Sequence, residues 1–338
     1  MEEKLIRWLI WVVALVVVLL CVGVFSLSIG STGVSLREML QALSKGKGDI
    51  GYSIVFNLRL PRVLLGFAVG GALSLSGVML QGLFRNPLVE PYTLGISGGA
   101  ALGVSLNIAL HLYHTAGVVS LPLSGFIGAL AVILLLYSLS MRRGILKMQG
   151  LLLTGVMISF ISSSLIMLIM AVSRAEDLHG IVFWIMGSLG ESDWPFVKLM
   201  GAASIIGLLL SYFFALDLNA LSLGEEEALH LGVNVERSKR LLFVLASLLT
   251  GLCVSSAGII GFVGLVVPHF VRMFVGEDHR ILLIASFLCG AGFLVLCDTL
   301  ARTVIAPLEL PVGVITGILG GALFVYALTR REVVLGEG

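Results

Sequence analysis

The chain contains a series of apolar runs, each about as long as a membrane-spanning helix, which short polar segments separate. A helix needs about 20 apolar residues to cross the hydrocarbon core of a bilayer. Charged residues make up 12% of the 338 residues, against about 25% in average soluble domains, and they gather between the runs. This pattern predicts an all-α, polytopic membrane protein surrounded by lipid bilayer.

Nine runs are long enough to span, and they cover residues 8–29, 63–84, 93–113, 118–140, 151–172, 196–216, 239–260, 281–300 and 311–329. A tenth, residues 261–276, is short and interrupted by Pro268 and His269, which is tolerated where protein surrounds the backbone. About ten transmembrane helices put both termini on one side. With the N-terminus inside, thirteen of the 21 Lys and Arg residues also lie inside, which favours an N-in, C-in orientation.

We expect residues 1–338 to form a single transmembrane domain with three notable connections. Residues 31–49 predict a short amphipathic helix on the outer side, with Ser35 as its N-cap. Residues 173–194 form a long outer connection, aromatic and acidic. The longest inner connection, about residues 217–238, contains a helical patch from Glu225 to Leu231 between two glycines that are typical helix stops.

Several classes of function are disfavoured by the sequence. A net charge of +1 gives no basic patch, so we expect no nucleic-acid partner. The four cysteines show no metal-ligand spacing, and no Walker loop occurs, so we expect no metal site and no cofactor in this chain. The segment 95–99 matches the G-x-S-x-G motif around Ser97, but it opens an apolar helix where a hydrolase needs a strand, a turn and a helix.

The positions of the carboxylates restrict the possible transport mechanisms. All twenty lie in predicted loops or near span ends, and the deepest, Asp298 and Glu309, flank the last outer connection. Carriers driven by an ion gradient usually hold ionisable groups within their spans. A ten-span protein without them is a passive pore, an assembly subunit, or a transporter that another chain energises.

The stretch RNPLVEP, residues 85–91, interrupts this apolar setting between two runs. Pro87 lacks a backbone N–H and forces Asn86 out of the helical region, so the preceding helix must end here. Asn-Pro and Glu-Pro pairs predict a rigid turn. By the orientation above, this turn lies at the cytoplasmic mouth of the protein.

Four segments together resemble the permease subunits of type II ABC importers for iron–siderophore, haem and cobalamin. They are residues 57–100, which include this turn, ALSLGEEEALHLGV (220–233), SSAGIIGFVGLVVPHFVRMFVGEDHR (255–280) and residues 298–328. The resemblance covers nearly the whole chain in order, and it does not identify the substrate. The substrate pathway that the resemblance implies is lined by Gly, Ser, Leu and Met without fixed charge, which suits a bulky chelate. This lining does not show whether the substrate is cobalamin, haem, a siderophore or an oxyanion such as molybdate.

The resemblance implies a non-enzymatic transport subunit in the inner membrane of a prokaryote. It implies a homodimer with the pathway on its two-fold axis, two cytoplasmic ATP-binding subunits that carry ATP and Mg, and an extracytoplasmic substrate-binding protein. The alternative is a secondary carrier or channel that works without an ATPase partner. An intramembrane hydrolase using Ser97 is a third and weaker alternative.

The resemblance also implies residue roles. At the cytoplasmic gate, Asn86 and Leu88 match gate-lining positions around Pro87, and the facing segment 144–150 matches the second gate element. That segment offers Lys147, Met148 and Gln149 where small hydroxyl residues are expected. The competing interpretation of residues 86–88 is a rigid turn alone.

Two further sets of positions follow from the same resemblance. The inner connection matches the helix that couples the permease to its ATPase through Gly224, Glu225, Ala228, Leu231 and Gly232; the competing interpretation is a solvated acidic loop. On the outer side, Arg59, Arg62 and Arg302 match positions that dock the binding protein. Their competing interpretation is snorkelling to lipid phosphates.

Overall fold

The computed structural model describes residues 2–30, 50–117, 119–142 and 145–335. Its elements are α1 (Glu2–Ser28), α3 (Ile50–Ser53), η1 (Ile54–Arg59), α4 (Leu60–Phe84), η2 (Pro91–Leu94), α5 (Ile96–Ala109), α6 (Leu112–Ala116), α7 (Ser120–Ser140), β1 (Met141–Arg142), β2 (Ile145–Leu146), α8 (Met148–Val172), α9 (Ala175–Ile185), α10 (Trp194–Phe213), α11 (Ala215–Leu223), α12 (Glu225–His230), α13 (Val235–Ala257), α14 (Val263–Val275), α15 (His279–Thr303) and α16 (Val312–Leu335). The described part is therefore helical apart from one short hairpin. The amphipathic helix predicted at residues 31–49 lies outside the described residues.

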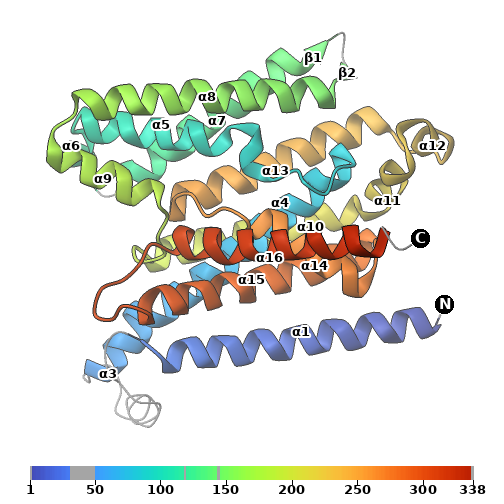
Figure 1. Cartoon of the computed structure of the whole chain (residues 1–338), viewed down its shortest axis with the longest axis horizontal. Coiled ribbons are helices and arrows are strands. Elements are labelled where there is room, and N and C mark those ends of the chain that lie inside the picture. The colour runs from blue at the N-terminus through green and yellow to red at the C-terminus, as the bar shows by residue number, and fades with distance from the viewer. Residues whose placement is uncertain (1, 31–49, 118, 143–144, 336–338) are drawn as a thin grey trace.

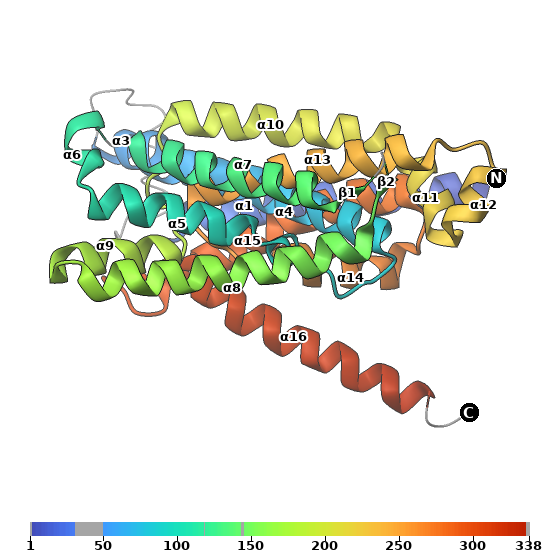
Figure 2. The same cartoon turned by 90° about the horizontal axis from the view of Figure 1, so that it is seen from above.

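Most of the long helices run along roughly the same direction, whereas α16 leaves the bundle at an angle, so the bundle has two ends (Figures 1 and 2). The helices α11 and α12 and the hairpin β1–β2 lie at one end, on the right of Figures 1 and 2, together with the start of α1 and the end of α16. The helices α3, α6 and α9 lie at the other end. We name these the α12 end and the α9 end. Both termini lie toward the α12 end, and the sidedness of the membrane stays a prediction.

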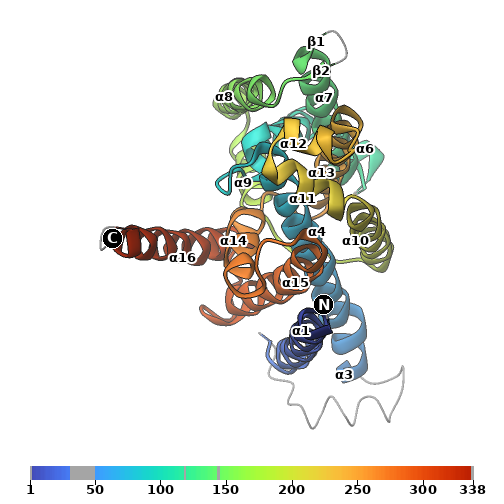
Figure 3. The same cartoon turned by 90° about the vertical axis from the view of Figure 1, so that its right-hand side faces the viewer.

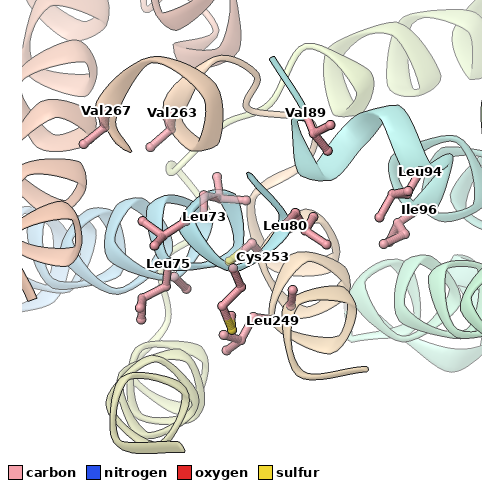
Figure 4. Close-up of a cluster of buried hydrophobic side chains, with 14 of the residues drawn as sticks. Leu73, Leu75, Leu80, Val89, Leu94, Ile96, Leu249, Cys253, Val263 and Val267 are labelled. Atoms are coloured by element: carbon pink, nitrogen blue, oxygen red, sulfur yellow. The ribbon is translucent and has the colours of Figure 1, made fainter. Parts of the chain in front are cut away.

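Helix α4 forms the centre of the bundle (Figure 3). It packs against α10, α13, α14 and α15, and nearly all of its side chains from Val63 to Leu83 are buried. Figure 4 shows Leu73, Leu75 and Leu80 of α4 among side chains of α13 and α14. Pro61 lies in the first turn of α4, directly after the π-helix η1. By contrast, α1 is largely exposed apolar surface, as expected of a helix that faces lipid.

Glycines bring helix backbones into direct contact around this centre, as small residues do in helix packing within membranes. A Cβ atom on Gly70 of α4 would overlap the carbonyl oxygen of Gly290 in α15. A Cβ atom on Gly99 of α5 would likewise overlap the carbonyl oxygen of Gly128 in α7. These two contacts hold α4 to α15 and α5 to α7 at backbone distance.

Hydropathy and length divide the described helices into two groups. Seven are long and apolar enough to cross a membrane, and three apolar helices are shorter: α5, α14 and the 312–327 part of α16. Helix α14 is short, as predicted, but it continues through Pro268 without a break. The connection 173–194, predicted as long, aromatic and acidic, contains α9. The count of ten spans stays a prediction.

Residues 93–113, predicted as one span, do not form one continuous helix. The 3-10 turn η2 leads into Gly95, whose φ of +77° breaks the helix, and α5 ends at Ala109 after 14 residues. That length is about 21 Å, short of a 30 Å hydrocarbon core. Hydropathy does not reveal this break, because Gly95 and its neighbours are as apolar as the residues of a membrane-spanning helix.

The segment before α5 is instead fixed by polar contacts within the protein. The Glu90 carboxylate accepts a hydrogen bond from the backbone N–H of Phe262, and the Tyr92 hydroxyl accepts one from Ile260 N–H at 3.2 Å. Both partners belong to the connection between α13 and α14. Non-helical backbone of this kind is stable inside a membrane protein where other protein groups satisfy it. These contacts tie the turn after α4 to the connection that precedes α14.

The variant Gly70→Ala tests the close contact between α4 and α15. We expect it to destabilise the purified chain by about 1–3 kcal/mol, because the added methyl group pushes the backbone of α15 away. Thermal unfolding in detergent measures the effect. The control is Gly201→Ala in α10, where nothing lies within 4 Å of an added Cβ; it should melt at or above the wild-type temperature. Equal melting of both variants would contradict the packing.

Candidate functional site at the α12 end

A cavity of about 580 Å³ opens at the α12 end between four segments of the chain. Its lining comes from the end of α4, the hairpin with the start of α8, the first residue of α12 and the second turn of α13: Leu83, Phe84, Arg85, Asn86, Ile145, Leu146, Lys147, Met148, Gln149, Gly150, Leu152, Glu225 and Lys239. The structure thus brings four predicted gate residues and one predicted coupling residue to one cavity.

The turn after α4 is built as the sequence predicts. Arg85 ends the helix in the left-handed region, with φ of +49°. The Asn86 side-chain oxygen accepts a hydrogen bond from Leu88 N–H at 2.9 Å, and its backbone N–H donates to Gln81 at 3.2 Å. Such an Asx turn, with Pro87 inside it, fixes the backbone. The Leu88 side chain remains half exposed, so the rigid turn presents an apolar residue outward.

The facing element is a hairpin that sequence reasoning missed. Strands β1 and β2 pair antiparallel, with Met141 opposite Leu146, and Lys147 N–H donates to Ser140 O at 3.3 Å. The hairpin is too short for an alternating pattern to reveal it. It places exposed Lys147 and Gln149 and half-buried Met148 at the start of α8, on the cavity wall.

Helix α12 has the position predicted for a coupling element, between Gly224 and Gly232, which both have positive φ. Leu231 is 65% exposed, and Leu229, which the sequence did not single out, is 60% exposed. Ala228 is fully buried, so its predicted contact with a partner is wrong: it packs α12 onto the bundle. Leu229 and Leu231 are thus exposed apolar side chains at this tip of the protein, and the coupling role of α12 stays a prediction.

A polar cluster holds α11, which precedes α12, to the start of α15. Asn219 accepts a hydrogen bond from His279 N–H at 2.8 Å and donates one to Asp278 at 3.1 Å. Lys4 reaches the same Asp278 carboxylate at 3.0 Å from α1. The hydrogen bonds from Arg280, and then those from Asn219 and Lys4, hold the pKa of Asp278 below its ordinary value. The carboxylate therefore stays ionised and fastens three helices together near α12.

The three arginines predicted for docking lie at the α9 end, but they point largely into the protein. Arg62 contacts Asp298 at 2.9 Å and Glu309 at 2.7 Å. Arg302 is buried, contacts Asp298 at 3.1 Å and donates to the Ser26 hydroxyl at 2.8 Å. Arg59 is also buried and donates to Leu27 O at 2.7 Å. The docking role of the three arginines stays a prediction, and the buried Arg59 and Arg302 join α1 to η1 and to the end of α15.

Two other predictions bear on chemistry. Ser97 lies in the first turn of α5, and the 3-10 turn η2 precedes it, so the strand of a nucleophile elbow is missing at this position. Within residues 2–30, 50–117, 119–142 and 145–335, no three His, Cys, Asp or Glu side chains gather as a metal site would require.

Comparison with known proteins gives the family. Residues 15–330 match the model of the FecCD transport family. The chain is 40% identical to the hemin transport system permease protein HmuU of Yersinia pestis, over 94% of this chain and 95% of that protein. It is 40% identical to the Fe(3+) dicitrate transport system permease protein FecD of Escherichia coli, over 92% and 95%.

A solved structure agrees with this assignment. It is described as an inward-facing conformation of a metal-chelate type ABC transporter, and it matches with a TM-score of 0.83 at 33% identity, over 94% of this chain and 98% of that chain. A molybdate import system permease protein, MolB of Haemophilus influenzae, is 38% identical over 93% of this chain and 92% of that protein. The chain belongs to the FecCD transport family.

Proposed function

We propose that this chain is the permease subunit of an ATP-driven importer for a metal chelate, in the inner membrane of a prokaryote. It forms the substrate pathway as a homodimer, two separate ATPase subunits drive it, and an extracytoplasmic binding protein delivers the substrate. Relatives named for hemin and Fe(3+) dicitrate support the substrate class. ATP and Mg belong to the ATPase chains, and this chain carries out no catalysis.

The observation that carries the proposal is the arrangement at the α12 end. A short helix presents two exposed leucines outward, and its first residue, Glu225, lines the same cavity as Asn86 and Lys147. A partner that binds the leucines would act directly beside the mouth of the pathway. Under the proposal Asn86, Pro87 and Leu88 form one side of the cytoplasmic gate, and Lys147, Met148 and Gln149 form the facing side.

The alternative, a secondary carrier or channel, requires an ionisable group that is free to carry a coupling ion. The buried carboxylate of Asp298 is paired with two arginines, and that of Glu90 accepts a backbone hydrogen bond. Both carboxylates thus have partners in the structure. The arrangement gives the alternative no support.

At the α9 end we propose that the binding protein docks around Arg62 and Glu309, the most accessible members of the arginine cluster. Arg59 and Arg302 lie buried below this surface, where they fix the ends of α1, α4 and α15. Charges at the rim of an interface mainly steer encounter and orientation. The buried arginines contribute to the stability of the chain itself.

The variant Arg302→Ala separates these two roles. Removing one partner of a buried ion pair costs about 3–5 kcal/mol, because the remaining charge stays buried. We therefore expect a marked fall in the melting temperature of the purified chain, measured without any binding protein. Lys198→Ala removes an exposed cation of α10 and should change stability by about 0.5 kcal/mol or less. An unchanged melting temperature for Arg302→Ala would favour a purely docking role.

The double variant Leu229→Asp with Leu231→Asp tests the docking surface on α12. Each leucine buried in an interface contributes about 1.5–3 kcal/mol, so we expect the ATPase subunits to be lost during co-purification. The chain itself should melt as the wild type does, because both side chains are exposed. Leu308→Asp makes the same change at the α9 end, where Leu308 is 70% exposed, and should leave association intact. Normal co-purification of the double variant would contradict the proposal.

A further inference from the structure

Lys239 is a buried cation between α12 and the hairpin β1–β2, which we call the gate hairpin after its proposed role. Its side chain is 3% exposed, in the second turn of α13. Its Nζ atom lies 3.0 Å from a Glu225 carboxylate oxygen and 2.7 Å from a Glu236 carboxylate oxygen. Glu225 is the first residue of α12, and Glu236 lies one turn before Lys239 on α13. The ammonium therefore joins α12 to α13 by charge as well as by packing.

Glu236 continues the connection to the other wall of the cavity. While its Oε1 atom contacts Lys239, its Oε2 atom accepts a hydrogen bond from the backbone N–H of Leu146 at 2.9 Å. Leu146 is the last residue of β2 and is fully buried, directly before Lys147. The two oxygens of one carboxylate thus hold the cation and the hairpin at the same time.

The path from α12 to the hairpin consists of three short polar contacts. Hydrogen bonds to charged groups are shorter and stronger than neutral ones. A buried lysine that lost both carboxylates would keep an uncompensated charge, so at least one of them has to stay with it. Lys239 is too buried to bind the transported substrate directly. Its geometry instead suits a group that fixes the distance between two moving parts.

We propose that Lys239 is a positioning residue that transmits movement of α12 to the gate hairpin. The path runs from Glu225 through Lys239 and Glu236 to the Leu146 N–H. When the ATPase displaces α12, the hairpin and the start of α8 move with it. This inference rests on the proposed function, in which α12 docks the ATPase and residues 147–149 belong to the gate.

The test follows the hairpin directly and needs no transported substrate. Spin labels at Ile145, an exposed residue of β2, and at Arg7, an exposed residue of α1, report the position of the hairpin relative to the bundle. The complete complex with its ATPase is assembled with an excess of unlabelled chain. The distance between the labels is measured without nucleotide and with ATP and vanadate, and ATP hydrolysis is measured in parallel.

In the wild type we expect ATP to shift the distance between the two labels. In Lys239→Met we expect hydrolysis to persist and the shift to be lost. Lys239→Arg, which keeps the positive charge, should restore much of the shift. Arg237→Met removes an exposed cation two residues away and should keep the full shift. A purely structural role would lower the melting temperature of Lys239→Met but leave its ATP-driven shift unchanged.

A second variant keeps the inference testable if Lys239→Met does not fold. Glu225→Gln alters the half-exposed end of the path, and it should also abolish the shift. A full shift in either variant, or a hairpin that does not move in the wild type, would overturn the inference. Failure of the wild-type chain to bind the ATPase would overturn the proposed function as well, so the two failures are distinguishable.

Discussion

The close packing of α4 against its neighbours determines where the other helices and the turn at Arg85 lie. Lipid offers helices little hydrophobic reason to associate, so they associate where small residues let backbones touch. Gly70 against Gly290 is such a contact, and Cys253 and Leu249 of α13 fill the other side of α4 (Figure 4). With α4 fixed, its end at Arg85 has a fixed position, and so does the turn that follows.

Two sets of polar contacts attach other segments to α13 or to the connection that follows it. Glu90 and Tyr92 bind the connection between α13 and α14. At the α12 end, Glu236 and Lys239 of α13 bind the hairpin and α12. Because α13 packs directly on α4, the moving parts proposed for gating are attached to the most buried of the long helices that the structure describes. A force on α12 therefore has a short route to the cavity.

Much of this organisation could be predicted from the sequence, for physical reasons. Hydropathy identifies long helices because lipid demands about 20 apolar residues, and Pro87 and the paired glycines at 224 and 232 determine backbone directly. Burial and partners could not be predicted. The sequence does not show whether an arginine such as Arg302 faces solvent or pairs with Asp298. Ala228 and Leu229 differ in exposure only because α12 turns one face to the bundle. The hairpin, with two residues in each strand, is below the length at which a pattern is visible.

Import by reconstituted vesicles shows whether this chain is a pathway that other chains drive. Proteoliposomes are loaded with the purified chain alone or with its ATPase subunits and binding protein. Labelled hemin, ferric dicitrate, cobalamin and molybdate are then offered in turn. The account predicts uptake of a metal chelate only with all partners and ATP present. Uptake by the chain alone, driven by an ion gradient, would contradict it.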